Sequence, residues 1–179
     1  MIDPVIELSI AMALALLLGV AAWHKASDTL RFGAVLRAYE LLPASLVRPT
    51  ARLLAVIEAC TAVGLLHPAS RKVAALAAVA LLTTYTVAIS VNIARGRREI
   101  DCGCFAASAR VPLSNWLLLR NLFLMLAACA LLLPLRERTL IWVDGLTMTT
   151  ALATMALLWA STQRLSQTGP ALRRMGGTQ

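Results

Sequence analysis

The sequence predicts an all-α membrane protein, a polytopic bundle of transmembrane helices. Hydrophobic residues make up 59% of the 179-residue chain, and the mean hydropathy is +0.75. A soluble domain of this size has too little interior to bury that many apolar side chains. The apolar residues also come in long blocks, without the periodicity of half-buried helices or strands. Because lipid admits only helices and closed barrels, and the blocks have the length of helical spans, we expect little or no sheet.

Five apolar blocks are candidate membrane spans. A helical span needs about 20 residues, and the second block falls short of this and carries Glu58 near its middle. The chain starts with two acids and no base, so we interpret the first block as a retained span and not as a signal peptide. We expect residues 1–161 to form one transmembrane domain and residues 162–179 to be a disordered tail. Four blocks form the expected core and the last is a fifth span: 5–23, 53–67, 73–93, 116–133 and 140–160.

A different pattern separates the first two spans. Phe32, Val35, Leu36 and Tyr39 follow the i, i+3, i+4, i+7 spacing of one helical face. The other positions there are mostly polar or small. The pattern predicts an amphipathic helix over 29–42 that lies on the membrane surface and ends before a proline.

The charge of the chain is strongly positive. Seventeen Lys and Arg against nine Asp and Glu give a net charge of +8. These basic residues lie in the gaps between apolar blocks, where membrane proteins carry them for topology and for contact with anionic headgroups. We therefore expect the basic residues to contact the lipid bilayer, and we expect no binding of nucleic acid.

Two arguments disagree about orientation. In a five-span arrangement, the side with the loop between the third and fourth spans has twelve Lys and Arg, and the other side has four. The positive-inside rule then places this loop in the cytoplasm. However, the loop contains a cysteine pair, and paired cysteines that carry out disulfide chemistry are most useful in an oxidising compartment. Both orientations stay open on the residues alone.

The cysteine pair is the strongest chemical signal in the chain. Cys102 and Cys104 flank Gly103, which permits the sharp bend that so small a disulfide ring requires. Such a bond departs from relaxed geometry and is therefore easier to reduce. Asp101 opposes thiolate formation, whereas three neighbouring basic residues favour it: Arg97, Arg98 and Arg110. We interpret Cys102 and Cys104 as a redox-active pair; half of a metal site and incidental thiols are the alternatives.

Two further cysteines lie within predicted spans. Cys60 and Cys129 suit the small apolar role that buried cysteine usually has. The alternative is a second redox pair that passes electrons to a lipid-soluble acceptor. The two histidines, His24 and His67, are isolated from each other and from the cysteines, so the sequence predicts no metal site.

Polar residues within the spans are candidate supporting residues, because such groups are costly in hydrocarbon and usually face the bundle interior. Glu58 is a possible partner for Arg120 across two helices, and Asn121 is a candidate for an interhelical hydrogen bond. His24 and Lys25 end the first span. Their expected place is the membrane interface, and the alternative is a site shared with the surface helix.

The order of these motifs resembles the methylamine-utilisation protein MauE family, within the DoxX-like group of four-helix membrane proteins. The resemblance covers residues 14–133, and its most specific part is the block from Asn92 to Phe105. One departure is Ala106, where the family pattern leads us to expect glycine. The motifs that carry the resemblance are His24-Lys25, Tyr39-Glu40-Leu41-Leu42-Pro43, Glu58, Asn92-Ile93-Ala94-Arg95-Gly96-Arg97, Asp101-Cys102-Gly103-Cys104-Phe105 and Arg120-Asn121.

The resemblance implies a function. The family is associated with maturation of the small, disulfide-rich subunit of periplasmic methylamine dehydrogenase, together with a thioredoxin-like partner, MauD. By this resemblance Cys102 and Cys104 are the redox pair of a thiol–disulfide oxidoreductase, and their loop faces the periplasm from the bacterial inner membrane. A membrane quinone is the candidate electron carrier. The alternatives are a non-catalytic assembly scaffold for the same client and a metal-handling protein that uses the two thiolates.

Overall fold

The computed structural model describes residues 3–97, 99–100, 113–134, 142–147, 149–150, 153–154 and 157. The chain divides into two compact units, residues 1–136 and 137–179, and each is considered by itself. Cys102, Cys104 and Asp101 lie outside the described residues, as does the predicted boundary between residues 161 and 162.

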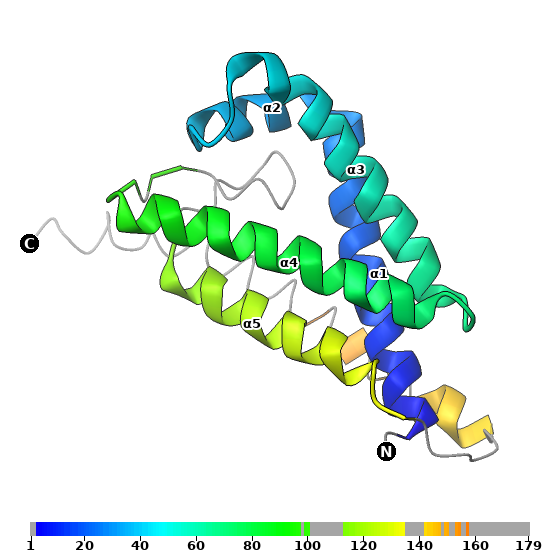
Figure 1. Ribbon diagram of the computed structural model, residues 1–179. Coiled ribbons are helices and arrows are strands. Elements are labelled where there is room, and N and C mark those ends of the chain that lie inside the picture. Colours follow the sequence, from blue (N-terminus) through cyan, green and yellow to red (C-terminus); the bar gives the residue numbers. More distant parts are fainter. Residues whose placement is uncertain are drawn as a thin grey trace, which may run out of the picture. The chain divides into compact units, whose positions relative to one another are not determined.

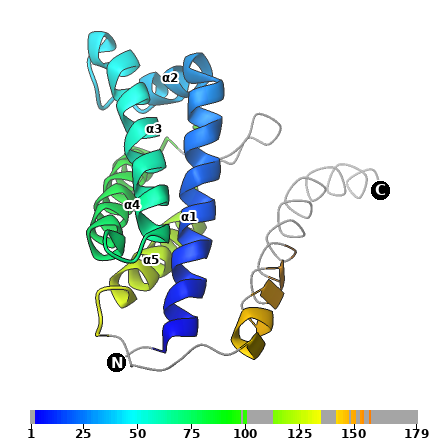
Figure 2. The same ribbon diagram turned by 90° about the vertical axis from the view of Figure 1, so that its right-hand side faces the viewer.

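The first unit consists of two antiparallel helix pairs that cross at a wide angle, with one short helix across the end of the first pair (Figure 1). The short helix, α2, packs on α3 and α1 at the end of the bundle where α1 stops and α3 starts (Figure 2). The main packing contacts join α1 with α3, α4 with α5, and α3 with α4. The helices are α1 (Pro4–Ser27), α2 (Thr29–Ala38), α3 (Ala44–Leu66), α4 (Arg71–Ala94) and α5 (Asn115–Ala130).

Local sequence signals explain where the first helices begin. The Asp3 carboxylate accepts a hydrogen bond from the backbone N–H of Val5 at 2.9 Å, and Pro4 occupies the first turn, where its missing N–H costs nothing. Asp28 both ends α1 and caps α2, because its side chain accepts from the backbone N–H of Arg31 at 3.0 Å. A single aspartate thereby turns the chain from the first span into the helix across the bundle end.

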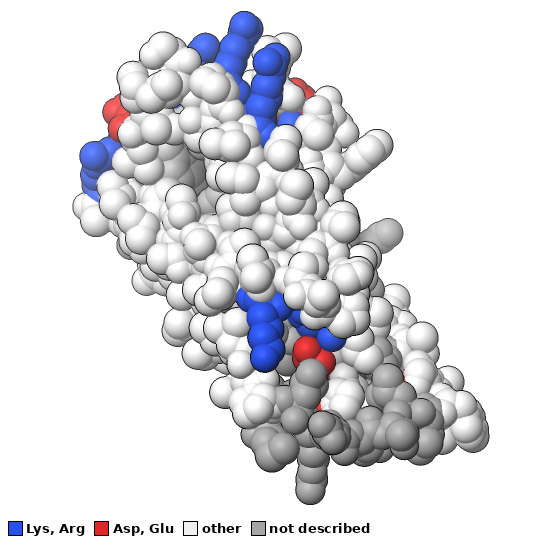
Figure 3. Space-filling model, turned by 45° about the vertical axis from the view of Figure 1, so that its right-hand side comes forward, with Lys and Arg blue, Asp and Glu red and all other residues white. Residues whose placement is uncertain are grey.

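The helices pack through small side chains. Alanines fill much of the interface among α1, α3 and α4, while leucine, valine and phenylalanine side chains cover the outside. In a soluble domain the distribution is the reverse, with the large apolar side chains inside. Small side chains at the interfaces suit a lipid solvent, in which close approach of helices drives their association. Figure 3 shows a band of uncharged surface between two groups of charged side chains. The buried alanines of the largest described core cluster are Ala11, Ala15, Ala62, Ala74, Ala75, Ala78 and Ala128.

The all-α prediction is confirmed for the described residues, and three helices are long and apolar enough to cross a membrane: α1, α3 and α4. The predicted start of the second span at residue 53 is wrong, because α3 begins at Ala44 and runs for 23 residues. In the sequence, Arg48, Pro49 and Arg52 are typical of a polar connection between spans, which is why the predicted start came too late. Pro49 lies inside α3, in its second turn, so it removes one backbone hydrogen bond, to the carbonyl of Ser45, and the helix continues past it.

The fourth predicted span is a shorter apolar helix. The α5 helix has 16 residues, about 24 Å at 1.5 Å per residue, against a hydrocarbon thickness of about 30 Å. Its backbone continues through tight turns at Leu131, Leu132 and Leu133. In the second unit, residues 142–147 are helical, and the rest of the predicted span 140–160 is described only at scattered positions.

The predicted surface helix is present but stops earlier than residue 42. The α2 helix ends at Ala38, and Glu40 then adopts a φ of +49°, which no helix can continue. The chain reaches α3 through Pro43, whose extended backbone precedes the first turn of α3.

Close packing between α3 and α4 is testable at Gly64. A Cβ at Gly64 would lie 3.0 Å from the Ala74 Cβ, whereas a Cβ at Gly19 would meet Ala62 at 3.9 Å, an ordinary contact. Because both sites are helical, alanine gains the same helix propensity at each. We expect Gly64→Ala to be less stable than Gly19→Ala by about 1–2 kcal/mol, from overpacking. Thermal unfolding in detergent checks this, and equal stability of the two variants would contradict it.

Candidate functional site

A buried ion pair joins the end of α1 to the middle of α3. The Lys25 ammonium donates hydrogen bonds to both Glu58 carboxylate oxygens, each at 2.7 Å. Their side chains are only 4% and 1% exposed. Lys25 lies in the last turn of α1, where the helix dipole also favours a positive charge.

Two aromatic side chains complete this cluster. The Tyr85 hydroxyl on α4 donates to Glu58 Oε1 at 2.6 Å. The Lys25 ammonium lies 5.1 Å from the ring centroid of Phe32 on α2 and 5.3 Å from that of Tyr85. Both distances are within the range of cation–π attraction. Four helices, α1 to α4, therefore each contribute one side chain to the Lys25–Glu58–Tyr85–Phe32 cluster.

An apolar pocket adjoins the cluster, and we call it the α2–α4 pocket. It has a volume of about 270 Å³ and lies among α2, α3, α4 and the turn between α2 and α3. Lys25 and Tyr85 lie in its wall, and most of the remaining lining is aliphatic or aromatic. The other lining residues are Phe32, Val35, Leu36, Tyr39, Leu41, Leu42, Thr50, Leu54, Thr84, Ala88 and Ile89.

The cysteine loop starts and ends beside this pocket. Ile100 and Leu113, the described residues on either side of it, both pack in one hydrophobic cluster with Tyr39, Ile89 and Leu117. Tyr39 and Ile89 also line the α2–α4 pocket. The two ends of the segment that contains Cys102 and Cys104 are thus fixed against the pocket wall.

A surface ion pair holds the same region together. Arg97, just after α4, donates to Glu40 at 2.6 Å and lies near the carbonyl of Ala38 at 3.5 Å. The hydrogen bond and charge of Arg97 lower the pKa of the Glu40 carboxyl, and Glu40 in turn raises the pKa of Arg97. The pair connects the turn after α2 to the beginning of the cysteine loop.

The predicted partner of Glu58 is wrong, since Lys25 and not Arg120 binds its carboxylate. Arg120 instead donates to the Asn121 side chain at 3.2 Å. The interhelical hydrogen bond predicted for Asn121 is confirmed, because its amide donates to Thr86 on α4 at 3.3 Å.

The expected interfacial place is wrong for Lys25, which the structure buries against the surface helix. His24 is only half-buried, and no described interaction connects its imidazole to the cluster. The alternative interpretation, a site formed with α2, therefore applies to Lys25 alone.

The two cysteines of the spans are free thiols. Cys60 on α3 and Cys129 on α5 are both exposed on the outside of the bundle. The structure therefore does not place them in a disulfide. Within the described part of the chain, no three His, Cys, Asp or Glu side chains come together as metal ligands.

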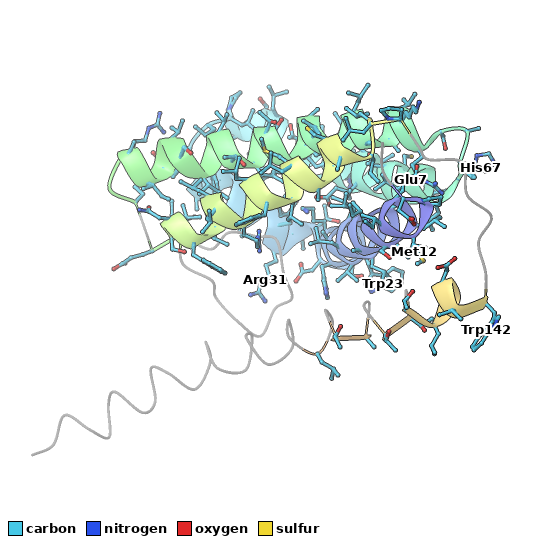
Figure 4. The ribbon with its side chains drawn as sticks, turned by 90° about the horizontal axis from the view of Figure 1, so that it is seen from below. Glu7, Met12, Trp23, Arg31, His67 and Trp142 are labelled. Carbon is cyan, nitrogen blue, oxygen red and sulfur yellow. The ribbon has the colours of Figure 1, made fainter. Side chains whose placement is uncertain are left out.

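Sequence reasoning missed Tyr85 and a second buried ion pair. Tyr85 belongs to the run Thr83-Thr84-Tyr85-Thr86, which is unusually polar for an apolar span and was the available signal. Glu7 and Arg71 pair at 3.2 Å, and Arg71 also donates to the carbonyl of Leu65 at 3.0 Å, which caps the end of α3. Figure 4 shows Glu7 on the same side of the view as His67, which follows α3.

Basic side chains gather at the end of the bundle that carries α2 (Figure 3). Arg37, Arg48 and Arg52 line a second hollow of about 320 Å³ between α2 and α3. None of the three makes an ion pair with a carboxylate among the described residues. Trp23 and Arg31 project outward at the same region (Figure 4), as expected for side chains near lipid headgroups.

Breaking the buried ion pair should be costly. Lys25→Met leaves the Glu58 carboxylate buried without its cation, and we expect a loss of about 3–5 kcal/mol. The double variant Lys25→Met/Glu58→Leu removes both charges and should recover much of this stability. Thermal unfolding in detergent measures both. Lys72→Met, at an exposed lysine, is the matched control and should change stability little. A double variant less stable than Lys25→Met would contradict this account of the pair.

Comparison with known proteins identifies the family. The family model of methylamine utilisation protein MauE matches residues 3–135. The methylamine utilization protein MauE of Paracoccus denitrificans is 40% identical over 131 residues, which cover 73% of this chain and 70% of that protein. Its counterpart from Methylorubrum extorquens is 40% identical over 135 residues, 74% of this chain and 72% of that protein. No solved structure matches the chain. The match spans all five helices of the first unit and the cysteine loop, so the chain belongs to the MauE family.

Proposed function

We propose that this protein is a membrane thiol–disulfide relay that assists maturation of an exported client during methylamine utilisation. The client is the small subunit of methylamine dehydrogenase, and a thioredoxin-like protein carries disulfides between the two. The observation that carries the proposal is the Cys102-Gly103-Cys104 motif, on a segment whose two ends are fixed at Ile100 and Leu113.

The chemistry is thiol–disulfide exchange. The thiolate of one cysteine attacks a disulfide sulfur of the partner, and a mixed disulfide forms as the partner's other sulfur leaves as a thiolate. The second cysteine then attacks the mixed disulfide and releases the partner as a dithiol, which leaves Cys102 and Cys104 as a disulfide. In the reverse direction a partner thiolate attacks the Cys102–Cys104 disulfide, and the partner's second thiolate resolves the mixed disulfide, so that the partner leaves as a disulfide and the pair is reduced. In the sequence, Arg98 and Arg110 lie near the pair, and positive charges beside a cysteine favour the reactive thiolate.

Fixed ends support this use of the motif. A pair that must meet a partner's sulfur benefits from a defined position, because ordering the segment before the encounter lowers the entropy lost in the reaction. Ile100 and Leu113 pack in one cluster, and the Glu40–Arg97 ion pair adds a polar restraint. The described helices therefore form a frame for the cysteine segment.

A periplasmic location of the cysteine segment completes the proposal. Disulfide formation proceeds in an oxidising compartment such as the bacterial periplasm. The charge count opposes this orientation, but the positive-inside rule counts short free loops. Lys25 lies within α1, Arg31 and Arg37 lie within α2, and Arg48 and Arg52 lie within α3. Five of the twelve basic residues counted there therefore belong to helices.

The second candidate is a scaffold that holds the client without redox chemistry. The basic hollow at Arg37, Arg48 and Arg52 favours it, since three guanidinium groups without described carboxylate partners suit an acidic surface. In this case the two cysteines are structural and do not change their oxidation state.

Thiol trapping during growth on methylamine separates the candidates. In a Cys60→Ser/Cys129→Ser background, we expect Cys102 and Cys104 to shift between dithiol and disulfide when the thioredoxin-like partner is deleted. Cys102→Ser or Cys104→Ser should abolish client maturation and accumulate a mixed disulfide through the remaining cysteine. A pair that stays fully oxidised or fully reduced supports the scaffold, and a bound metal lost in Cys102→Ser supports metal handling.

Orientation is tested by a membrane-impermeant maleimide on spheroplasts of the same background. After mild reduction, we expect labelling of Cys102 and Cys104 from the outside. A single cysteine introduced at Ser70, in the turn on the opposite end of the bundle, serves as the matched control and should react only after lysis. Labelling of the pair only after lysis would place the segment in the cytoplasm and contradict the periplasmic proposal.

A further inference from the structure

We propose that the α2–α4 pocket binds the head group of a membrane quinone, which reoxidises Cys102 and Cys104. This inference rests on the proposed relay function and adds the electron acceptor and its site. Four features of the pocket support it: its lining, an N–H donor of Lys25, its opening toward exposed apolar side chains and its position beside the ends of the cysteine segment.

The size and lining of the pocket fit a substituted ring. Its volume of about 270 Å³ is near the lower end for small-molecule sites, about 300–1,000 Å³. Phe32, Tyr39 and Tyr85 contribute aromatic rings, which stack favourably against another flat ring. Aliphatic side chains from α2, α3 and α4 make up most of the rest. A hydrophilic ligand would find few partners here.

The polar groups of the pocket suit carbonyl oxygens. An ammonium group has three N–H donors, and in the described structure Glu58 accepts from the Lys25 ammonium at 2.7 Å at each of its two oxygens. One donor is therefore left for a ligand in the pocket that Lys25 lines. A quinone offers carbonyl acceptors, and its oxygens become more negative as it is reduced. A hydrogen-bond donor fixed in a low-dielectric wall stabilises that change, even though the Glu58 carboxylate balances the charge of the ammonium.

The pocket also reaches the lipid-facing surface. Leu41 is 41% exposed and Thr84 is exposed, and both belong to the lining. On the outside of the neighbouring helices lie apolar side chains such as Val87, which is 56% exposed. An isoprenoid tail can therefore extend into lipid while the ring occupies the pocket.

The described ends of the cysteine segment lie beside the pocket. Four residues, Val35, Tyr39, Ala88 and Ile89, belong both to the pocket lining and to the cluster that fixes Ile100 and Leu113. Cys102 follows Ile100 by two residues, so their Cα atoms are separated by at most about 7 Å. A quinone in the pocket thus lies on the other side of the wall to which the cysteine segment is anchored.

The redox step balances without another reactant. The Cys102 and Cys104 thiols lose two protons and two electrons, and one S–S bond forms as two S–H bonds break. The quinone gains these two protons and two electrons, and its two carbonyl oxygens become the hydroxyls of a quinol. The disulfide can then oxidise the thioredoxin-like partner, which returns the pair to the dithiol.

The test is binding of decylubiquinone to the purified full-length protein in detergent, with decanol as a ring-free probe of the same tail length. Ala88→Phe places a ring in the pocket and should weaken decylubiquinone binding at least tenfold. Val87→Phe is the matched control on the lipid face of the same helix and should bind like the unmodified protein. If Ala88→Phe does not fold, Val35→Phe fills the same pocket from α2.

A second measurement follows the chemistry. Decylubiquinone and glutathione disulfide should both oxidise the reduced Cys102–Cys104 pair of the unmodified protein, and Ala88→Phe should slow the oxidation by decylubiquinone at least tenfold relative to Val87→Phe. Equal binding of decylubiquinone and decanol, or equal binding to Ala88→Phe and Val87→Phe, would overturn the quinone site. If glutathione disulfide does not oxidise the pair in the unmodified protein, the proposed relay is overturned instead.

Discussion

The Lys25–Glu58 ion pair is the interaction on which the arrangement of the helices depends. Two charges buried among apolar helices are tolerated only when they meet with good geometry, and here both carboxylate oxygens contact one ammonium at 2.7 Å. Alanine-lined interfaces let helices approach closely but do not by themselves specify rotation or register. The pair supplies that specification for α1 against α3, and the Tyr85 hydroxyl extends it to α4. The Glu7–Arg71 pair does the same at the other end of the bundle.

Composition and block length predicted the helical membrane fold, because an apolar run as long as a membrane span indicates that the segment lies in lipid. The start of α3 was missed for a physical reason. Arg48 and Arg52 are basic and Pro49 breaks helices, yet near a helix start these residues are tolerated at the membrane interface. Glu58 was identified because a carboxylate in a span demands an explanation. Its partner was not, since Lys25 is 33 residues away and only packing selects it over Arg120.

The position of α2 explains how a surface helix comes to form a pocket. Asp28 turns the chain at the end of α1, and the left-handed backbone of Glu40 turns it again before α3. Between these turns, Phe32, Val35, Leu36 and Tyr39 share one face of α2, as their helical spacing predicted. That face was expected to meet the membrane surface, and in the structure it lines the pocket with residues of α3 and α4. Amphipathicity therefore identified the buried face correctly. It could not distinguish a face turned toward lipid from one turned toward the protein's own pocket, because both surroundings are apolar.

The two buried ion pairs differ in a way that bears on function. Arg71 also donates a hydrogen bond to the carbonyl of Leu65, so the Glu7–Arg71 pair has a structural role at the end of α3. Lys25 and Tyr85 instead form part of the wall of a pocket. Apolar residues of similar volume often replace a buried pair without loss of stability, so the register that this pair specifies is one reason for charges at this place. The proposed ligand, which needs a donor in an apolar wall, is a second. The pocket lies beside the cluster that anchors the Cys102–Cys104 segment, so the proposed quinone site would connect the buried Lys25–Glu58 pair to the cysteines of this MauE family protein.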